Sequence, residues 1–449
     1  MSIPLDVVQL LHKKHSRKFS RRVFRARADL EAQRQRAAEF AARFGPKSKV
    51  IAMLANACTI GPVGQSSLLL VKPPKVFSII EDPVGAVSLV LQFAKNIQHD
   101  RVRSVKVDQS KLEEYDLAAN ALLDIVASEA VRERRNRRRR LQMTGIYPQN
   151  AAVKRFIRSM GIVKHLNISH EIAKDGEIAN IRLFDRRNKH YYVRQDPTKP
   201  DAKARTIEGF VNHFNSCLSD HKRALTPESR ATLGAYIGEI LGNAEDHPGF
   251  VDWTIQGYLD NSLEMPLCEI AIINFGKSIA ETLHELPKGH YTRKMIDPYI
   301  ILHSGRNFFR KEWRVADLLT LIALQGHVSS KNSTKADSRG QGTGDLIDFF
   351  QRVHRECAGK GGMNAKMAIL SGGTYVLFDG TYLMRESQDR GRVIAFNAQN
   401  DLHSPPDPKY VRSLGSVHFP GTVISIRFPL SVASTLTLGK NFDEQHSDN

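Results

Sequence analysis

The chain has 449 residues, of which 41% are hydrophobic, which suits two or three packed domains and excludes disorder throughout. The four cysteines show no metal-binding spacing, and no apolar run approaches the roughly 18 residues of a spanning helix. A disulfide framework, a structural zinc cluster and a membrane span are therefore not expected. Because the N-terminus also lacks the pattern of a secretory signal, we expect a cytoplasmic protein.

The positive charge of the chain is regional. Lysine and arginine outnumber aspartate and glutamate by 65 to 47, which gives a net charge of +18. Residues 1–45 carry a net +7, and the run VRERRNRRRR at 131–140 carries a net +6. Basic clusters attract polyanions, of which nucleic acid is the most common. A solvated helix face or a contact to an acidic protein explains the same composition, so both alternatives stay open.

Residues 1–75 form a basic N-terminal region. The stretch 5–45 is rich in Ala, Arg, Glu and Gln and has no proline or glycine from 5 to 44, which predicts a helix with one basic face. Residues 46–75 contain Gly-Pro and Pro-Pro pairs, which predict short strands and turns.

Residues 76–166 change to an alternation of strands and helices. Such an alternation predicts a small α/β domain. The predicted elements are, in order, strand RVRSVKVD (101–108), helix LAANALLDIVASEAVRER (117–134), strand LQMTGIY (141–147) and helix NAAVKRFIRSMGIVKHL (150–166).

This segment resembles a STAS domain, the fold of anti-sigma-factor antagonists. The resemblance rests on the strands VKVDQSKL and LQMTGIYPQN, the helix that opens at Tyr115-Asp116-Leu117-Ala118-Ala119, and the closing SMGIVKHL. Family members carry a phosphorylatable serine in the corresponding turn, whereas Asp116-Leu117-Ala118-Ala119 has no hydroxyl group. The resemblance therefore implies a docking module for a protein partner, without a phosphorylation switch.

The remaining chain divides into three parts by composition. Residues 167–199 are a polar linker with one predicted hairpin (179–195), and residues 433–449 form a polar tail expected to be mobile. Within residues 200–432 we expect helices first and strands afterwards, with a long irregular segment between them.

The stretch GEILGNAEDHPG (238–249) is the strongest chemical signal in the sequence. It ends a helical pattern that begins near Pro227, and Glu239, Asn243 and Asp246 fall on one stripe of that helix. An amide oxygen is a suitable Mg²⁺ ligand, and a carboxylate one turn away can act as a general base. A solvated helix face with polar residues in register is the alternative interpretation.

Three further motifs follow in order. CEIAIINFGKSI (268–279) predicts a buried strand that ends at Asn274-Phe275-Gly276. SRGQGTGDL (338–346) places three glycines before a predicted helix at 347–355, an arrangement that favours phosphate binding. FPGTVISIRFPL (419–430) predicts a strand that carries Thr422.

Together the four motifs resemble the nucleotide-binding boxes of the gyrase, Hsp90, histidine-kinase and MutL (GHKL) ATPase superfamily. The resemblance implies a C-terminal Bergerat-type α/β sandwich over 200–432 that binds ATP with Mg²⁺. It makes Glu239 the general base and Asn243 the Mg²⁺ ligand, with Asp246 lining the site. Asn274 stands where the family has the aspartate that binds the adenine amino group, and Ser278 replaces the second glycine of that box. The other implied nucleotide-binding residues are Gly276, Lys331 (or Lys335) in the ATP lid at 326–338, Gly340, Gly342, Gly344, and Thr422 beside Asn274.

Three functions from different classes are consistent with these features. The first is an ATP-dependent conformational switch, with or without slow hydrolysis, in a bacterial-type signalling system. The second is a serine or histidine protein kinase, which the pairing of a STAS-like domain with this ATPase resemblance favours. Its histidine motif, Ser169-His170-Glu171-Ile172, is incomplete. The third is a nucleic-acid-binding protein with a regulatory ATP site, which the two arginine-rich clusters favour.

Overall fold

The fold is known from a computed structural model that describes most of the chain after residue 47. The described residues are 48–61, 66–137, 139–160, 181–188, 202–220, 222–246, 252–260, 266–326, 328–329, 332, 341–357, 364–387, 391–430 and 434–437. The helix expected over 5–45, most of the expected lid, the incomplete histidine motif and most of the tail lie outside these ranges. Residues 49–129 and 142–449 group into one compact unit, and residues 1–48 and 130–141 into another.

A seven-stranded sheet forms the centre of the larger unit, and each strand is antiparallel to its neighbours. Its central strands are apolar and rich in isoleucine and valine, which suits strands covered on both faces. The strands, in their order across the sheet, are β14 (Val411–Ser413), β11 (Thr374–Phe378), β10 (Lys366–Gly372), β15 (Phe419–Pro429), β9 (Leu267–Phe275), β8 (Trp253–Asp260) and β6 (Ile181–Asn188).

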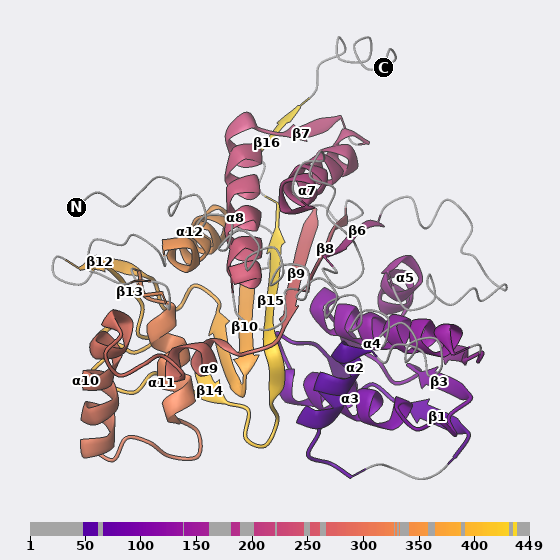
Figure 1. The fold of residues 1–449 in the computed structure, drawn as a ribbon. Coiled ribbons are helices and arrows are strands. Elements are labelled where there is room, and N and C mark those ends of the chain that lie inside the picture. The colour runs from indigo at the N-terminus through magenta and orange to yellow at the C-terminus, as the bar shows by residue number, and fades with distance from the viewer. Residues whose placement is uncertain are drawn as a thin grey trace, which may run out of the picture. The chain divides into compact units, whose positions relative to one another are not determined.

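Three long helices cover one face of this sheet (Figure 1). They are α7 (Ala202–Ser219), α8 (Pro227–Asp246) and α12 (Gln341–Cys357). The aromatic side chains of Phe210 and Phe214 on α7 are buried against the sheet, and Gly257 on β8 leaves room for both. The helix predicted to begin near Pro227 is thus confirmed.

The order of elements after residue 200 differs from the prediction. Strands β8 and β9 follow α8 directly, before most of the helices. The expected irregular segment contains three helices, α9 (Ile279–His284), α10 (Tyr291–Gly305) and α11 (Val315–Ala323). The prediction missed α9 and α11 because they have only six and nine residues, and tertiary packing, with residues such as Leu318 and Ile322 buried in the common core, stabilises helices of this length. It missed the 15-residue α10 because Pro298 lies inside that helix, and proline normally interrupts a helical pattern.

The N-terminal part of the larger unit is a βαβαβα segment. Strands β1 (Leu68–Val71), β3 (Ser104–Asp108) and β5 (Gln142–Ile146) form a parallel sheet in that order. Helices α3 (Pro83–Ile97) and α4 (Leu117–Asn136) connect these strands, and α5 (Ala151–Met160) follows β5. The predicted alternation of strands and helices is confirmed, and its sheet also includes β1, which precedes residue 76.

Residues 46–75 begin with helix α2 (Lys49–Ala57), which the prediction of short strands and turns did not include. The sequence KVIAMLANA has the apolar spacing of a helix, with Val50, Ile51 and Leu54 buried. The prediction was wrong for this helix because the proline pairs that suggested turns lie outside it, whereas strand β1 in the same range confirms the prediction of a short strand.

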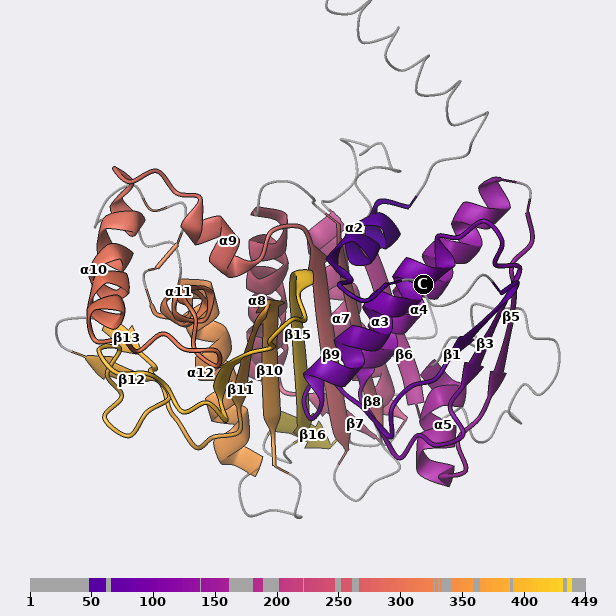
Figure 2. The ribbon, with the colours of Figure 1, turned by 90° about the horizontal axis from the view of Figure 1, so that it is seen from below.

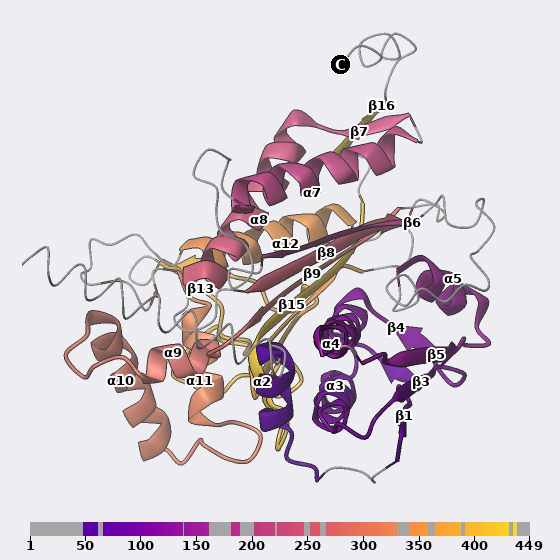
Figure 3. The same cartoon turned by 45° about the vertical axis from the view of Figure 1, so that its right-hand side comes forward.

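The α/β segment packs on the second face of the seven-stranded sheet, with α2, α3 and the start of α4 between the two sheets (Figures 2 and 3). Glu269 of β9 accepts a hydrogen bond from the backbone N–H of Leu117 at 2.8 Å, and Arg155 of α5 pairs with Asp260 of β8 at 2.5 Å. Residues 116–119, where the STAS family has its phosphorylatable turn, are completely buried. That turn is therefore closed to a partner in this arrangement.

The edge strand of the large sheet and three small two-stranded pairs complete the described structure. Strand β6 lies within the range 167–199 assigned to a linker, and it pairs with β8 as the edge strand of the large sheet. The second arm of the hairpin predicted there lies outside the described residues. The small pairs are β2 (Val76–Phe77) with β4 (Glu114–Tyr115), β7 (Arg223–Leu225) with β16 (Thr435–Thr437), and β12 (Arg385–Ser387) with β13 (Gly391–Val393).

Among the described residues, no helix is long and apolar enough to cross a membrane. The position of the arginine run 137–140 between a predicted helix (117–134) and a predicted strand (141–147) indicates side chains that face solvent. However, Arg137 is largely buried and forms an ion pair with Glu133 at 3.1 Å, one turn earlier on α4, whereas Arg139 and Arg140 are exposed. The prediction is therefore wrong for Arg137.

Candidate functional site

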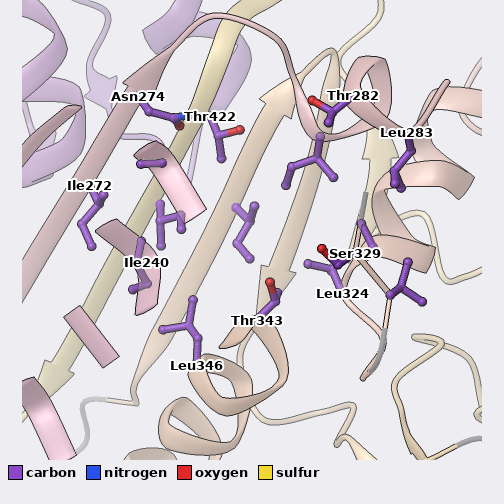
Figure 4. Close-up of a pocket in the computed structure, with 16 residues that line it drawn as sticks. Ile240, Ile272, Asn274, Thr282, Leu283, Leu324, Ser329, Thr343, Leu346 and Thr422 are labelled. Carbon is purple, nitrogen blue, oxygen red and sulfur yellow. The ribbon is translucent and has the colours of Figure 1, made fainter. Parts of the chain in front are cut away.

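A cavity of about 120 Å³ lies between the seven-stranded sheet and the layer formed by α8, α9 and α12 (Figure 4). Its walls are mainly aliphatic, with Ile240 from α8, Ile272 from β9 and Leu346 from α12 among them. Asn274 and Thr422 supply polar groups at one end. None of the described side chains that line the cavity carries a charge.

The alternation of two neighbouring strands places these polar groups together. In β9, Ile272 and Asn274 point into the cavity, while Glu269, on the other face, reaches the α/β segment. Thr422 of β15 is the direct cross-strand partner of Asn274. The resemblance to the nucleotide-binding boxes implied that these two residues lie side by side, and the strand register agrees with that position.

Gly421 permits the close approach of β15 to the end of β9. Its φ of 135° lies in a region that L-residues rarely adopt, and an added Cβ would lie 2.1 Å from the backbone oxygen of Asn274. Gly276, which follows β9, has a φ of 128°, and its N–H donates to the carbonyl of Pro420 at 3.1 Å. These two glycines therefore shape the polar end of the cavity.

The two polar residues differ in their hydrogen bonding. The Thr422 hydroxyl is 2.8 Å from that of Ser371, which also accepts the N–H of Ile279 at 2.9 Å. The side chain of Asn274 is 7% exposed and makes no hydrogen bond to any described residue. Because a buried amide normally has partners, its donor and acceptor are available to a ligand in the cavity.

Helix α8 brings the first predicted motif beside the cavity. Ile240 and Ala244 line it from successive turns. Glu239 lies one residue earlier on an exposed position of α8, outside the cavity wall. Asn243 and Asp246 belong to the last two turns of α8, and their side chains lie outside the described part of the structure.

The second glycine motif differs from its prediction. Helix α12 begins at Gln341, so Gly342 and Gly344 belong to its first turn instead of preceding the helix. Gly344 lies against the guanidinium group of Arg392, which pairs with Asp345 at 2.7 Å and Asp348 at 2.5 Å. These pairs support an early helix start that glycine alone disfavours. Gly340, Lys331 and Lys335 lie outside the described residues.

Helix α9 forms a wall of the cavity that the sequence did not reveal. Ser278, which replaces the second glycine of the first glycine box, caps this helix: its hydroxyl accepts the N–H of Glu281, and the Glu281 carboxylate accepts the N–H of Ser278. Ile279 and Leu283 of α9 line the cavity. The sequence signal was the spacing Ser-x-x-Glu of Ser278 and Glu281, the pattern of a capping box.

No family model, curated protein or solved structure matches this chain. Among the described residues, no group of three or more His, Cys, Asp or Glu side chains is arranged to hold a metal ion. The described residues form a largely apolar slot with one uncommitted amide, Asn274, and four residues that carry a hydroxyl group, Thr282, Ser329, Thr343 and Thr422. Such a slot suits a flat, uncharged heterocycle with hydrogen-bonding groups on one edge.

Proposed function

We propose that the chain binds ATP with Mg²⁺ as a protein of GHKL type, and that the purine ring enters the cavity between β9 and α8. The observation that carries the proposal is the pairing of Asn274 with Thr422 at the end of an aliphatic slot. The slot offers apolar surface to the faces of a ring and hydrogen-bonding groups to its edge.

The size of the cavity supports a ring as the buried group. A volume of about 120 Å³ between facing aliphatic walls provides room for a flat ring. The sugar and phosphates of a nucleotide whose ring lies here would extend towards other elements.

One helix end next to the cavity is suited to the phosphates, and the end of a second helix carries the proposed Mg²⁺ ligand. Thr343 in the first turn of α12 lines the cavity, so the N-terminal end of this 17-residue helix is near the ring. Backbone N–H groups and the helix dipole favour anions at such an end. The last turns of α8 carry Asn243, the proposed Mg²⁺ ligand.

The packing of the α/β segment supports a conformational switch as the role of the nucleotide. Strands β9 and β15 carry Asn274 and Thr422 on one face, and Glu269 and Arg427 on the face that contacts the segment. A ligand that shifts either strand therefore changes both faces together. The burial of residues 116–119 supports a switch without phosphorylation of that turn.

Calorimetry with Mg·ATP tests this proposal, and a variant that fills the cavity locates the site. In the Ala244→Phe variant the new ring occupies the slot, and we expect at least a tenfold loss of affinity. The Ala231→Phe variant places the same ring on an exposed position of α8 and is expected to bind normally. Absence of ATP binding by the wild-type protein, or equal binding by Ala244→Phe, overturns the proposal.

A second measurement distinguishes the fates of the bound nucleotide. Incubation with γ-labelled ATP, followed by separation of free phosphate from phosphoprotein, distinguishes hydrolysis from transfer. A switch of the proposed kind yields no phosphoprotein. Labelled protein would instead establish the kinase alternative.

A further inference from the structure

We infer that the cavity accepts a 6-oxopurine nucleotide as readily as a 6-aminopurine nucleotide. The inference rests on the proposed function and concerns the specificity of the same site. It follows from the chemistry of Asn274 and Thr422, the polar pair at the end of the cavity, and from the neutrality of the remaining lining.

Asn274 is able to present either edge of its amide to a ligand. A carboxamide has an acceptor oxygen and a donor NH₂ group side by side, and rotation by 180° exchanges them. No described residue forms a hydrogen bond with this side chain, so the protein does not fix its orientation. The amide therefore exchanges donor and acceptor without loss of an internal hydrogen bond.

The Thr422 hydroxyl is similarly reversible. In its 2.8 Å contact with the Ser371 hydroxyl either oxygen is able to donate, because Ser371 has a second acceptor in the carbonyl of Gly421 at 3.5 Å. When Ser371 donates to Thr422, the Thr422 proton is available to a ligand. When Thr422 donates instead, its oxygen is available as an acceptor.

The two purines differ in the pattern that these groups meet. Adenine presents an amino donor beside an acceptor nitrogen, whereas hypoxanthine presents a carbonyl acceptor beside an N–H donor. The Asn274 amide matches both patterns in its two orientations. A carboxylate at this position only accepts hydrogen bonds, so it would repel the carbonyl oxygen of a 6-oxopurine. With the neutral Asn274 at this position, the repulsion that would weaken the binding of a 6-oxopurine is expected to be absent.

The test compares Mg·ATP with Mg·ITP by calorimetry on the full chain, since inosine differs from adenosine only at this edge. We expect the two dissociation constants of the wild-type protein to agree within about tenfold. In Asn274→Asp we expect the preference for ATP over ITP to rise by about 100-fold, because a buried contact between two acceptor oxygens replaces a hydrogen bond. Asn274→Leu, which removes donor and acceptor together, should weaken both nucleotides to a similar extent.

The outcomes separate this inference from the function on which it rests. A wild-type protein that binds ATP with a preference over ITP above about tenfold overturns the inference and leaves ATP binding established. Binding of neither nucleotide overturns both. If the Asn274→Asp variant does not fold, the wild-type ratio of dissociation constants still decides the question.

Discussion

Glu269 and Arg427 form an ion pair that connects the large sheet to the α/β segment. The Arg427 Nε atom donates to Glu269 at 2.5 Å, and the second oxygen of Glu269 accepts the N–H of Leu117 at the start of α4. Arg427 also donates to the carbonyl of Tyr115 at 3.3 Å. Glu269 is almost fully buried, and this burial raises the pKa of its carboxyl group above the usual value. Removal of one partner therefore leaves a charge without compensation inside the protein.

A double-mutant cycle measures how much this ion pair contributes to the free energy of unfolding. We expect Glu269→Leu to lower the free energy of unfolding by about 3–5 kcal/mol, because Arg427 then remains buried without its partner. The double variant Glu269→Leu/Arg427→Leu should lose less than the single one, since neither charge remains. Urea unfolding measures each value. A double variant less stable than Glu269→Leu would contradict this account.

Gly421 is expected to tolerate no side chain. Its φ of 135° and the 2.1 Å approach of an added Cβ to the backbone of Asn274 predict that Gly421→Ala loses several kcal/mol and disturbs the cavity. Gly415 has a φ of 67° with open space around it, so Gly415→Ala should cost only about 1–2 kcal/mol. Thermal unfolding of both variants checks the difference, and equal losses would refute the steric argument.

Glu239 is predicted to support hydrolysis and to contribute little to binding. It lies on α8 one turn before Asn243 but outside the cavity wall. Glu239→Ala should bind Mg·ATP normally and lose about 100-fold or more of any turnover, the usual effect of losing a general base. Glu228→Ala, an exposed position on the same helix, serves as the control. Equal phosphate release by the wild type and Glu239→Ala would remove Glu239 from the mechanism.

Asp317 predicts a specific dependence of stability on pH. Its carboxylate is fully buried at the start of α11, where it accepts hydrogen bonds from Thr374 at 2.7 Å and the N–H of Arg314 at 2.8 Å. Burial raises its pKa above the usual 3.8. The folded state therefore holds the proton of Asp317 more tightly than the unfolded state does, and protonation of this carboxyl group stabilises the fold. This contribution to the free energy of unfolding is complete below about pH 3.8 and is lost as pH rises through the raised pKa.

Urea unfolding at several pH values therefore distinguishes the wild type from Asp317→Asn. The free energy of unfolding of the wild type, minus that of the variant, should decrease as pH rises above about 3.8. The variant lacks this contribution because its amide does not titrate. A difference that grows with pH would show that the pKa of Asp317 is lowered.

The arginine-rich run predicts salt-dependent binding to nucleic acid. For duplex DNA the logarithm of the binding constant should fall with the logarithm of salt at a slope near −0.9 per phosphate neutralised. Replacement of the exposed Arg139 and Arg140 by serine should flatten this slope, whereas Arg137→Ser should change it less because Arg137 pairs with Glu133. Filter binding of duplex DNA at two salt concentrations measures this slope for the wild type and for each variant. No binding at low salt would favour an acidic protein partner or a solvated face.

The local patterns of the sequence determined the main elements near the cavity. The apolar runs of β9 and β15 and the helical pattern from Pro227 correctly predicted three elements that line it. These runs depend on side-chain type and period, which a sequence expresses directly. The pairing of Asn274 with Thr422 was instead implied by the resemblance to the nucleotide-binding boxes, because the register of β9 and β15 exists only in the folded chain.

The tertiary structure alone decided the rest. Helix α9, the early start of α12 beside Arg392 and the burial of Leu117 under Glu269 depend on partners that are 47 to 152 residues away in the chain. A six-residue helix or a glycine-rich first turn has too little intrinsic stability to be read from composition. Its conformation is fixed only when distant side chains pack against it, and those contacts exist only in the folded chain.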